Sequence, residues 1–149
     1  MKKNNKKIKI AVIGLGYVGL PIAIELSKFF KVYGYDKKKQ RVRDLVSNED
    51  QTHEIESKVL RKTKVIFSDQ EKILENVNVF IVTIPTPVNK NNIPDLRLLK
   101  ESTRTISKYI KKNSLIVYES TVYPGCTEEV CLPILKENKK FENNKDFFN

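Results

Sequence analysis

Cysteine, histidine and long apolar runs are scarce in this chain, and each scarcity argues against a class of protein. The 149 residues include two cysteines and one histidine. Cys126 and Cys131 match no zinc-ligand spacing, so we predict no metal site and two free, buried thiols in a reducing compartment. No apolar run approaches the roughly 20 residues of a membrane helix, and no signal-peptide core follows the start. We therefore predict a cytoplasmic protein that has no membrane contact.

Motifs for nucleic-acid binding are also missing, although the chain is basic. The formal net charge is +10, with 40% apolar residues, which is a globular composition. The basic residues are spread over a tail at 1–7, the stretch after Asp36, 61–64 and 108–112, and they form no single stripe. With neither aromatic stacking motifs nor a helix-turn-helix pattern, nucleic acid is not an expected partner. The charge fits either solvated lysine-rich faces or a preference for an anionic small molecule.

The order of apolar segments predicts an α/β fold. Apolar, β-branched runs predict strands at 8–13, 32–35, 65–67, 77–83 and 115–118, and helical patterns lie between them. This alternation predicts a Rossmann-type doubly wound parallel sheet with helices on both faces. The polar stretch after residue 137 ends in an apolar pair at 147–148, where such a sheet would need a further strand. We therefore expect the chain to be a fragment.

Three features predict how the later helices begin or bend. Ser68 and Glu71 form a capping-box pair that would open a helix ending near residue 75. Asp95 can cap a helix whose inner face is Leu99, Thr103, Ile106 and Ile110. Pro133 should kink the helix expected at 127–137.

A GxGxxG sequence, Gly14-Leu15-Gly16-Tyr17-Val18-Gly19, follows the first predicted strand and opens the first helix. In this context Gly14 would allow a tight turn, Gly16 would let the backbone approach a pyrophosphate, and Gly19 would let the helix pack close to the strand. The start of the helix would supply N–H groups for the phosphates. A glycine-rich turn that binds nothing is the competing interpretation.

Asp36 ends the second predicted strand, where a carboxylate accepts hydrogen bonds from a ribose and repels the 2′-phosphate of NADP. The sequence therefore favours NAD. Lys37, Lys38, Lys39 and Arg41 leave this open, because nearby cations can tolerate a further phosphate.

Two proline-containing loops should leave the same edge of the sheet, at Thr83 to Pro87 and at Glu119 to Gly125. Rigid loops with hydroxyl side chains suit a site that holds a nicotinamide and orients a hydroxyl or a water. Taken singly, each set of prolines fits mere turn shaping equally well. Glu119 could support the site from behind or be only an exposed carboxylate at the end of a strand.

Together these motifs resemble the UDP-glucose/GDP-mannose dehydrogenase family. The resemblance rests on Gly14 to Pro21, Pro85-Thr86-Pro87, Pro94-Asp95-Leu96, and Glu119 to Gly125 followed by Thr127-Glu128-Glu129. The form of the last motif, with Thr52 and Glu54, is most similar to the branch that acts on UDP-N-acetylhexosamines. The resemblance implies an oxidoreductase that converts the C6 alcohol of a nucleotide sugar to the acid with two NAD⁺, for capsule, O-antigen or other surface polysaccharide.

The resemblance also implies roles for individual residues. Thr121 would position the substrate hydroxyl or a water. The cofactor would be held by Gly14, Gly16, Tyr17, Val18, Gly19, Asp36, Arg41, Thr83, Pro85, Thr86, Pro87, Ser120 and Thr121. The family's nucleophilic cysteine lies further along its members' chains, and neither Cys126 nor Cys131 is in its motif. We thus expect 8–149 to be an NAD-binding domain that cannot turn over alone, from a parent that is a homodimer.

Other functions remain possible on the sequence. A standalone NAD-sensing module would need no catalytic domain. A dehydrogenase of the 6-phosphogluconate or hydroxyacyl type would share the GxGxxG, although not the two later loops as a set. The lone His53 is expected in a loop without a catalytic role.

Overall fold

The computed structural model describes residues 8–137 except 89 and 92 and places five parallel strands in one sheet. The strand order is β3-β2-β1-β4-β5, which confirms the predicted Rossmann-type topology. The strands are β1 (Lys9–Ile13), β2 (Lys31–Tyr35), β3 (Ile66–Ser68), β4 (Val79–Val82) and β5 (Leu115–Tyr118). The helices are α1 (Gly19–Ser27), α2 (Lys39–Val46), α3 (Ser57–Leu60), the 3₁₀ helix η1 (Glu71–Asn76), α4 (Arg97–Ser107), the π-helix η2 (Thr127–Cys131) and α5 (Leu132–Lys136).

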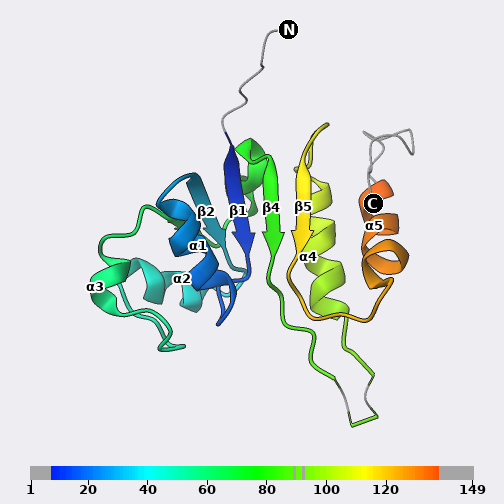
Figure 1. Ribbon diagram of the computed structural model, residues 1–149, viewed down its shortest axis with the longest axis horizontal. Coiled ribbons are helices and arrows are strands. Elements are labelled where there is room, and N and C mark those ends of the chain that lie inside the picture. Colours follow the sequence, from blue (N-terminus) through cyan, green and yellow to red (C-terminus); the bar gives the residue numbers. More distant parts are fainter. Residues whose placement is uncertain (1–7, 89, 92, 138–149) are drawn as a thin grey trace, which may run out of the picture.

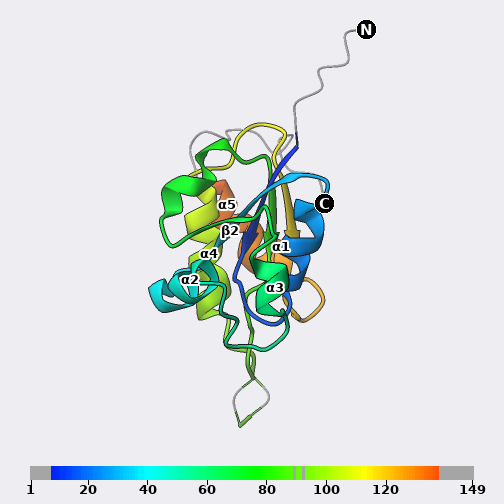
Figure 2. The same cartoon turned by 90° about the vertical axis from the view of Figure 1, so that its left-hand side faces the viewer.

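The central strand β1 is covered on both faces, which explains its continuous apolar sequence. Ile10 and Val12 belong to a core cluster that includes residues of α1, α2 and α3. Ala11 and Ile13 point the other way, into a cluster that includes residues of η1, α4, η2 and α5. Figure 2 shows α1 and α4 on opposite sides of the strands. The doubly wound arrangement therefore follows from an apolar strand whose two faces bury different helices.

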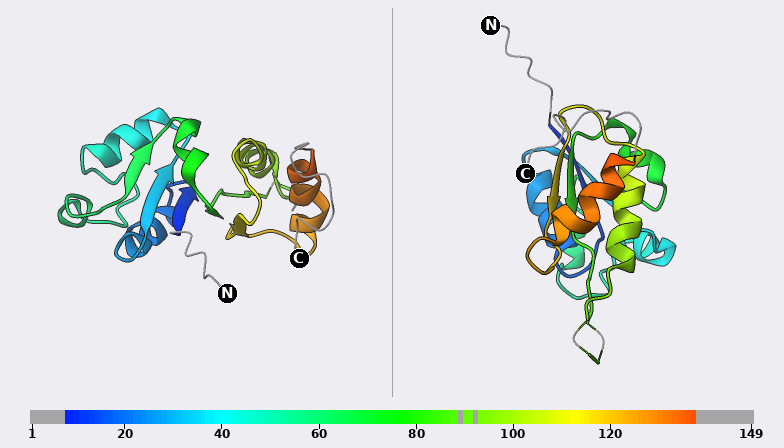
Figure 3. Two further views of the ribbon diagram at one scale, coloured as in Figure 1. Left: turned by 90° about the horizontal axis from the view of Figure 1, so that it is seen from above. Right: turned by 90° about the vertical axis from the view of Figure 1, so that its right-hand side faces the viewer.

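The strand order reverses between β1 and β4. These strands pair in parallel, with Ile13 beside Val82 at their carboxyl ends. In Figure 1 the labelled strands point toward one edge of the sheet, and the turns after β1, β4 and β5 all leave there. Seen from above, α1 to α3 accompany one half of the sheet and α4 and α5 the other (Figure 3). A crevice at the carboxyl edge beside such a reversal is where open α/β sheets bind their ligands.

The predicted capping box at Ser68 and Glu71 is wrong. Ser68 is the last residue of β3, and η1 begins after Gln70 without a side-chain cap. The Ser68 hydroxyl accepts a hydrogen bond from Gln70 N at 3.0 Å, which is a local turn. The Glu71 carboxylate turns away to Lys108, 2.9 Å from its Nζ, on the segment that follows α4.

Asp95 is not the N-cap residue of α4, because Leu96 occupies that position and Asp95 lies one residue before it. The helix is preceded by Leu96 and has no side-chain cap in the N-cap position, while Asp95 accepts a hydrogen bond from Arg97 N at 3.0 Å. The predicted inner face is confirmed, because Leu99, Thr103, Ile106 and Ile110 are all buried. The placement of the apolar residues, rather than the cap, fixes how α4 lies on the sheet.

Pro133 lies where the last helix changes its geometry. The π-turns of η2 end at Cys131, and α5 continues with Pro133 in its first turn. The kink expected at Pro133 stays a prediction. Within the described part of the chain, no helix is long and apolar enough to cross a membrane. The basic tail at 1–7 and the segment 138–149, with its predicted further strand, lie outside the described residues.

Candidate functional site

The turn between β1 and α1 requires glycine at two of the three glycine positions of its GxGxxG sequence. Gly14 has φ +92°, and its N–H donates to Tyr35 O at 2.9 Å, which joins the turn to β2. A Cβ on Gly14 would lie 2.9 Å from Thr83 O, and one on Gly19 would lie 1.9 Å from Gly14 O. Both contacts are with backbone atoms that no side-chain rotation can move. The tight turn and the close packing of α1 are therefore built as the sequence predicted.

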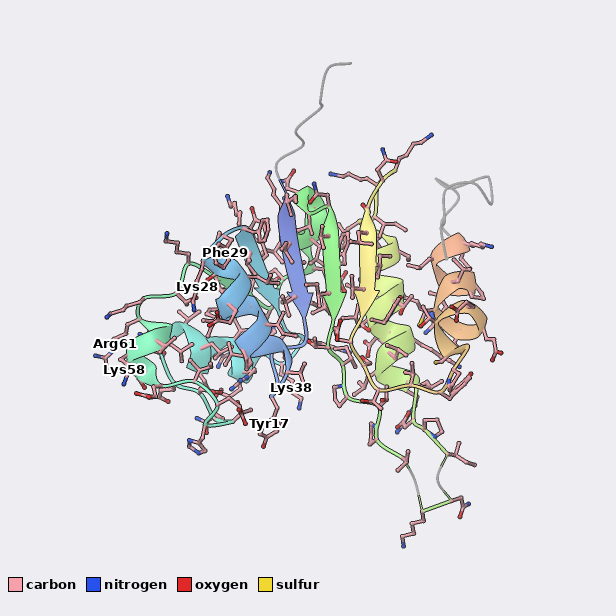
Figure 4. The ribbon with its side chains drawn as sticks, in the orientation of Figure 1. Tyr17, Lys28, Phe29, Lys38, Lys58 and Arg61 are labelled. Atoms are coloured by element: carbon pink, nitrogen blue, oxygen red, sulfur yellow. The ribbon has the colours of Figure 1, made fainter. Side chains whose placement is uncertain are left out.

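Gly16 differs from these two glycines because the space around it is open. A Cβ built on Gly16 would meet nothing within 4 Å. The neighbouring Tyr17 and Val18 are 68% and 53% exposed, whereas Leu15 is fully buried and anchors the turn. In Figure 4 the Tyr17 side chain extends outward below the strands, at the opposite end of α1 from Lys28 and Phe29. A ligand can therefore approach the backbone of this turn from the carboxyl edge.

The start of α1 carries positive character without internal compensation. Val18, in the N-cap position, makes no side-chain cap, and the first turn contains no acidic residue. The helix is nine residues long, and its dipole and the N–H groups that precede the Leu20 N to Gly16 O bond lie at the end next to Gly16. An anionic group such as a pyrophosphate fits this position.

Asp36 is held at the end of β2 by both of its carboxylate oxygens. Oδ2 accepts a hydrogen bond from Leu15 N, and Oδ1 accepts one from Lys38 N, both at 2.9 Å. Each oxygen keeps a further lone pair, so the carboxylate can accept two ribose hydroxyls in a fixed orientation. The role of Asp36 in binding a ribose stays a prediction.

Arg41 lies beneath the phosphate turn and not beside an open ligand surface. Its Nε donates to Leu15 O at 2.7 Å, and its side chain is only 10% exposed. Its Nη1 lies 2.7 Å from Oδ1 of Asp50, an ion-pair contact without the angle of a hydrogen bond. The Asp50 side chain is 1% exposed. Burial raises the pKa of Asp50, but hydrogen bonds from Thr52 and Ile55 and the adjacent Arg41 guanidinium outweigh this and bring it to about 2.

Asp50 was not predicted as a site residue. It stands in a polar loop after α2 whose composition predicts only exposure. The weak indication was the spacing Asp50-x-Thr52, which is common in turns that hydrogen-bond their own backbone. The Thr52 hydroxyl donates to Asp50 Oδ1 at 2.7 Å, so Thr52 serves this local turn.

Thr83 joins the end of β4 to the glycine turn from inside. Its side chain is buried, and Oγ1 lies 3.0 Å from Ile13 O and 2.7 Å from Gly14 O. The single hydroxyl proton can serve either carbonyl. Thr83 therefore supports the glycine turn, and its hydroxyl is already used within the protein.

The two proline-containing loops are tied to each other at the carboxyl edge. Ile84 N donates to the Ser120 hydroxyl at 3.1 Å, and the Thr86 hydroxyl donates to Thr121 O. Glu119 N also donates to Val82 O at 2.8 Å, which aligns the start of the second loop with β4. The structure thus brings Thr86, Ser120 and Thr121 together, and the side chain of Thr121 is exposed at this rim.

The two cysteines are free and buried, as predicted. Cys126 is 0% and Cys131 1% exposed. Burial raises the pKa of the Cys126 thiol, so it is not an activated thiolate. His53 is an exposed turn residue with φ 56°, as its sequence context predicted. Among the described residues no group of three or more His, Cys, Asp or Glu could hold a metal ion.

Comparison with known proteins decides which family has this geometry. The profile of the UDP-glucose/GDP-mannose dehydrogenase family, NAD binding domain, matches residues 8–148. The chain belongs to this family. Its cofactor is NAD, and the resemblance inferred from the four motifs is confirmed. The match also decides against the 6-phosphogluconate and hydroxyacyl dehydrogenase types.

Individual relatives show the same relationship. The chain is 42% identical over 144 residues to the UDP-N-acetyl-D-glucosamine 6-dehydrogenase of Pseudomonas aeruginosa, covering 96% of this chain and 34% of that protein. It is 41% identical over 139 residues to the protein CapL of Staphylococcus aureus, covering 93% and 33%. Among solved structures, a UDP-D-ManNAc dehydrogenase from Pyrococcus horikoshii superposes with a TM-score of 0.79 at 32% identity, covering 88% of this chain and 32% of that one.

The names of these relatives agree with the predicted likeness to the UDP-N-acetylhexosamine branch. The chain spans about a third of the length of the curated relatives it matches. The NAD-binding domain is therefore the part of the family that this chain contains.

Proposed function

We propose that this chain is the cofactor-binding part of an enzyme that oxidises the C6 alcohol of a UDP-N-acetylhexosamine to the uronic acid. The reaction consumes two NAD⁺ and one water and forms two NADH. The observation that carries the proposal is the β1/β4 reversal at the carboxyl edge of the sheet, where an open Gly16, a helix start without an acidic residue and a fixed Asp36 carboxylate lie together. Relatives named as dehydrogenases of UDP-N-acetyl sugars support the substrate class.

Each part of NAD has a fitting place along this edge of the sheet. The backbone of Gly14, Gly16, Tyr17, Val18 and Gly19 would hold the pyrophosphate at the start of α1. Asp36 would accept the hydroxyls of the adenosine ribose, with Arg41 supporting that end from below. The nicotinamide would lie toward the second half of the sheet, against the loop Pro85-Thr86-Pro87 and Ser120. Thr83 would support this edge through its bonds to the glycine turn.

Thr121 is proposed to position the C6 hydroxyl or the attacking water. Its side chain is exposed at the rim, and its carbonyl accepts the Thr86 hydroxyl, so its backbone is fixed. A hydride acceptor and a hydroxyl placed on one rigid rim would bring the reacting atoms into contact. Cys126 and Cys131 have no part in this chemistry because both are buried.

The setting of the whole enzyme is part of the same proposal. The free thiols and the use of NAD⁺ favour the cytoplasm. By analogy with the family, the complete protein would be a homodimer that supplies uronic acids for capsule or other surface polysaccharide. The domain 8–149 would bind NAD⁺ without completing the reaction.

Two assays test the proposal together. The complete gene product, incubated with UDP-N-acetylglucosamine and NAD⁺, should form two NADH for each sugar oxidised, while the purified 149-residue chain should form none. Oxidation of UDP-glucose in place of the N-acetyl sugars would show that the substrate class is wrong. Turnover by the 149-residue chain, or no oxidation of any UDP-sugar by the complete protein, would overturn the enzymatic assignment.

A further inference from the structure

Four cations follow Asp36, and any of them could in principle accept the 2′-phosphate that distinguishes NADP from NAD. Lys37, Lys38 and Lys39 are exposed, and Lys37 forms an ion pair with Glu101 on α4. Arg41 differs from the lysines because its side chain is nine-tenths buried and lies against the phosphate turn. Arginine is the side chain best shaped to bind a phosphate, so its environment matters most.

One residue links Arg41 to the ribose-binding carboxylate. Leu15 N donates to Asp36 Oδ2 at 2.9 Å, and Leu15 O accepts from Arg41 Nε at 2.7 Å. The carboxylate and the guanidinium therefore contact the two polar backbone atoms of the same buried residue. This places the positive charge next to the place where the adenosine ribose would lie.

The remaining nitrogens of Arg41 face the loop after α2. Nη1 lies 2.7 Å from Asp50 Oδ1, and Nη2 lies 3.4 Å from the Thr52 hydroxyl. With Nε on Leu15, all three guanidinium nitrogens face acceptors of this protein. The charge of Arg41 is balanced by a carboxylate that solvent does not reach.

Asp50 is itself held in place by its loop. Its Oδ1 accepts from Thr52 N at 3.0 Å and from the Thr52 hydroxyl at 2.7 Å. Its Oδ2 accepts from Glu54 N and Ile55 N, both at 2.9 Å. A carboxylate with this many donors stays in one position, so Arg41 stays with it.

We infer that Asp50 is a specificity-determining residue, which keeps the site selective for NAD⁺ by holding the Arg41 guanidinium away from the position of a 2′-phosphate. The inference rests on the proposed placement of NAD at this edge of the sheet. Asp50 touches neither the dinucleotide nor the reacting atoms and acts through Arg41. Without Asp50, the guanidinium loses its counter-charge, and the charge next to Asp36 becomes available to a phosphate.

The test compares the dissociation constants of NAD⁺ and NADP⁺ for the purified chain, measured by calorimetry. Asp50→Asn removes the charge and keeps the size of the side chain. Glu49→Gln is the matched control, because Glu49 is the neighbouring, exposed carboxylate and the change in net charge is the same. The double variant Asp50→Asn/Arg41→Met removes both members of the ion pair.

We expect Asp50→Asn to tighten NADP⁺ relative to NAD⁺ by roughly 10- to 100-fold, the worth of a new hydrogen bond to a charged group. Glu49→Gln should leave the ratio of the two constants at the wild-type value. In the double variant the preference for NAD⁺ over NADP⁺ should be as strong as in the wild type or stronger, because the gain in NADP⁺ affinity depends on Arg41. A folded Asp50→Asn with an unchanged ratio, or a double variant that keeps the gain, would overturn the inference.

Arg41→Met tests the inference independently if Asp50→Asn does not fold. It should weaken both dinucleotides by the same factor, since Leu15 O loses its donor while the 2′ position is unaffected. Selective weakening of NADP⁺ would show that Arg41 already meets the 2′-phosphate and would overturn the inference. If the wild-type chain binds no NAD⁺, the proposed cofactor site fails together with this inference. Normal NAD⁺ binding with an unchanged ratio in Asp50→Asn rejects the inference alone.

Discussion

Gly16 and Gly19 lie three residues apart in the same turn, and an added methyl group should have opposite effects at the two positions. At Gly16 the new Cβ would meet no atom within 4 Å. The folded protein can therefore accept alanine, and the loss of chain entropy in the unfolded state should stabilise it by about 0.4–1 kcal/mol. At Gly19 the Cβ would lie 1.9 Å from Gly14 O and 2.4 Å from Thr83 Oγ1, so the backbone must move.

The loss of stability expected for Gly19→Ala follows from the cost of overpacking. Forcing extra volume into a packed site costs about 1–3 kcal/mol. For a domain of this length each kcal/mol corresponds to a shift of roughly 2 to 4 °C in the midpoint of thermal unfolding. Gly19→Ala should therefore lower the midpoint by about 2 to 12 °C, whereas Gly16→Ala should leave it unchanged or raise it slightly.

Gly16→Ala, which should not destabilise the fold, should instead weaken the binding of NAD⁺. The open space at Gly16 is where the pyrophosphate should approach the backbone, so its methyl group should weaken NAD⁺ by about tenfold or more. Differential scanning calorimetry gives the stability, and isothermal titration with NAD⁺ gives the affinity. A Gly16→Ala variant that is folded and binds NAD⁺ as tightly as the wild type would refute the assignment of this turn to the pyrophosphate.

Three further predictions concern single side chains. Thr83→Val removes the only hydroxyl that the described structure shows bonding to Gly14 O, and should lower the free energy of unfolding by about 1–3 kcal/mol in a denaturant titration, while Thr83→Ser should lose less. Asp36→Ala should weaken NAD⁺ by roughly 10- to 100-fold and NADP⁺ less, because the ribose loses its acceptor while the 2′-phosphate loses a repulsive neighbour; equal losses in calorimetry would contradict this. The pKa of Asp50 is lowered to about 2, so its contribution to stability is present above its ordinary pKa of 3.8 and is lost as the pH falls toward 2. Acid unfolding curves of Asp50→Asn should lack this part of the pH dependence, and a curve parallel to that of the wild type would count against the buried ion pair.

The fold and the centre of the site were predictable because their residues act locally. The apolar runs at 8–13 and 115–118 specify strands, and the spacing of Gly14, Gly16 and Gly19 follows from what a backbone must do around a phosphate. The position of Asp36 at the end of β2 was predictable for the same reason, while its role in binding a ribose stays a prediction.

The parts that the sequence did not reveal depend on contacts between distant segments. Glu71 was expected to complete a capping box, but it pairs with Lys108, which lies 37 positions away in the sequence. Arg41 was expected to be available to the cofactor or to a further phosphate, but a loop with no apolar pattern brings Asp50 against it. A sequence pattern does not show which of several polar residues will be buried, because burial depends on the hydrogen-bond donors that the folded loop places around each side chain.

The most direct test of the account is the thermal unfolding of the purified chain with NAD⁺, with NADP⁺ and with neither. A ligand at about 100 times its dissociation constant stabilises the folded state by about 2.7 kcal/mol. For this domain that should raise the midpoint by roughly 5 to 11 °C with NAD⁺ and by much less with NADP⁺ at the same concentration. Equal shifts with both dinucleotides would contradict the roles of Asp36 and Asp50, and no shift with either would contradict the assignment of the cofactor site to the carboxyl edge of the sheet.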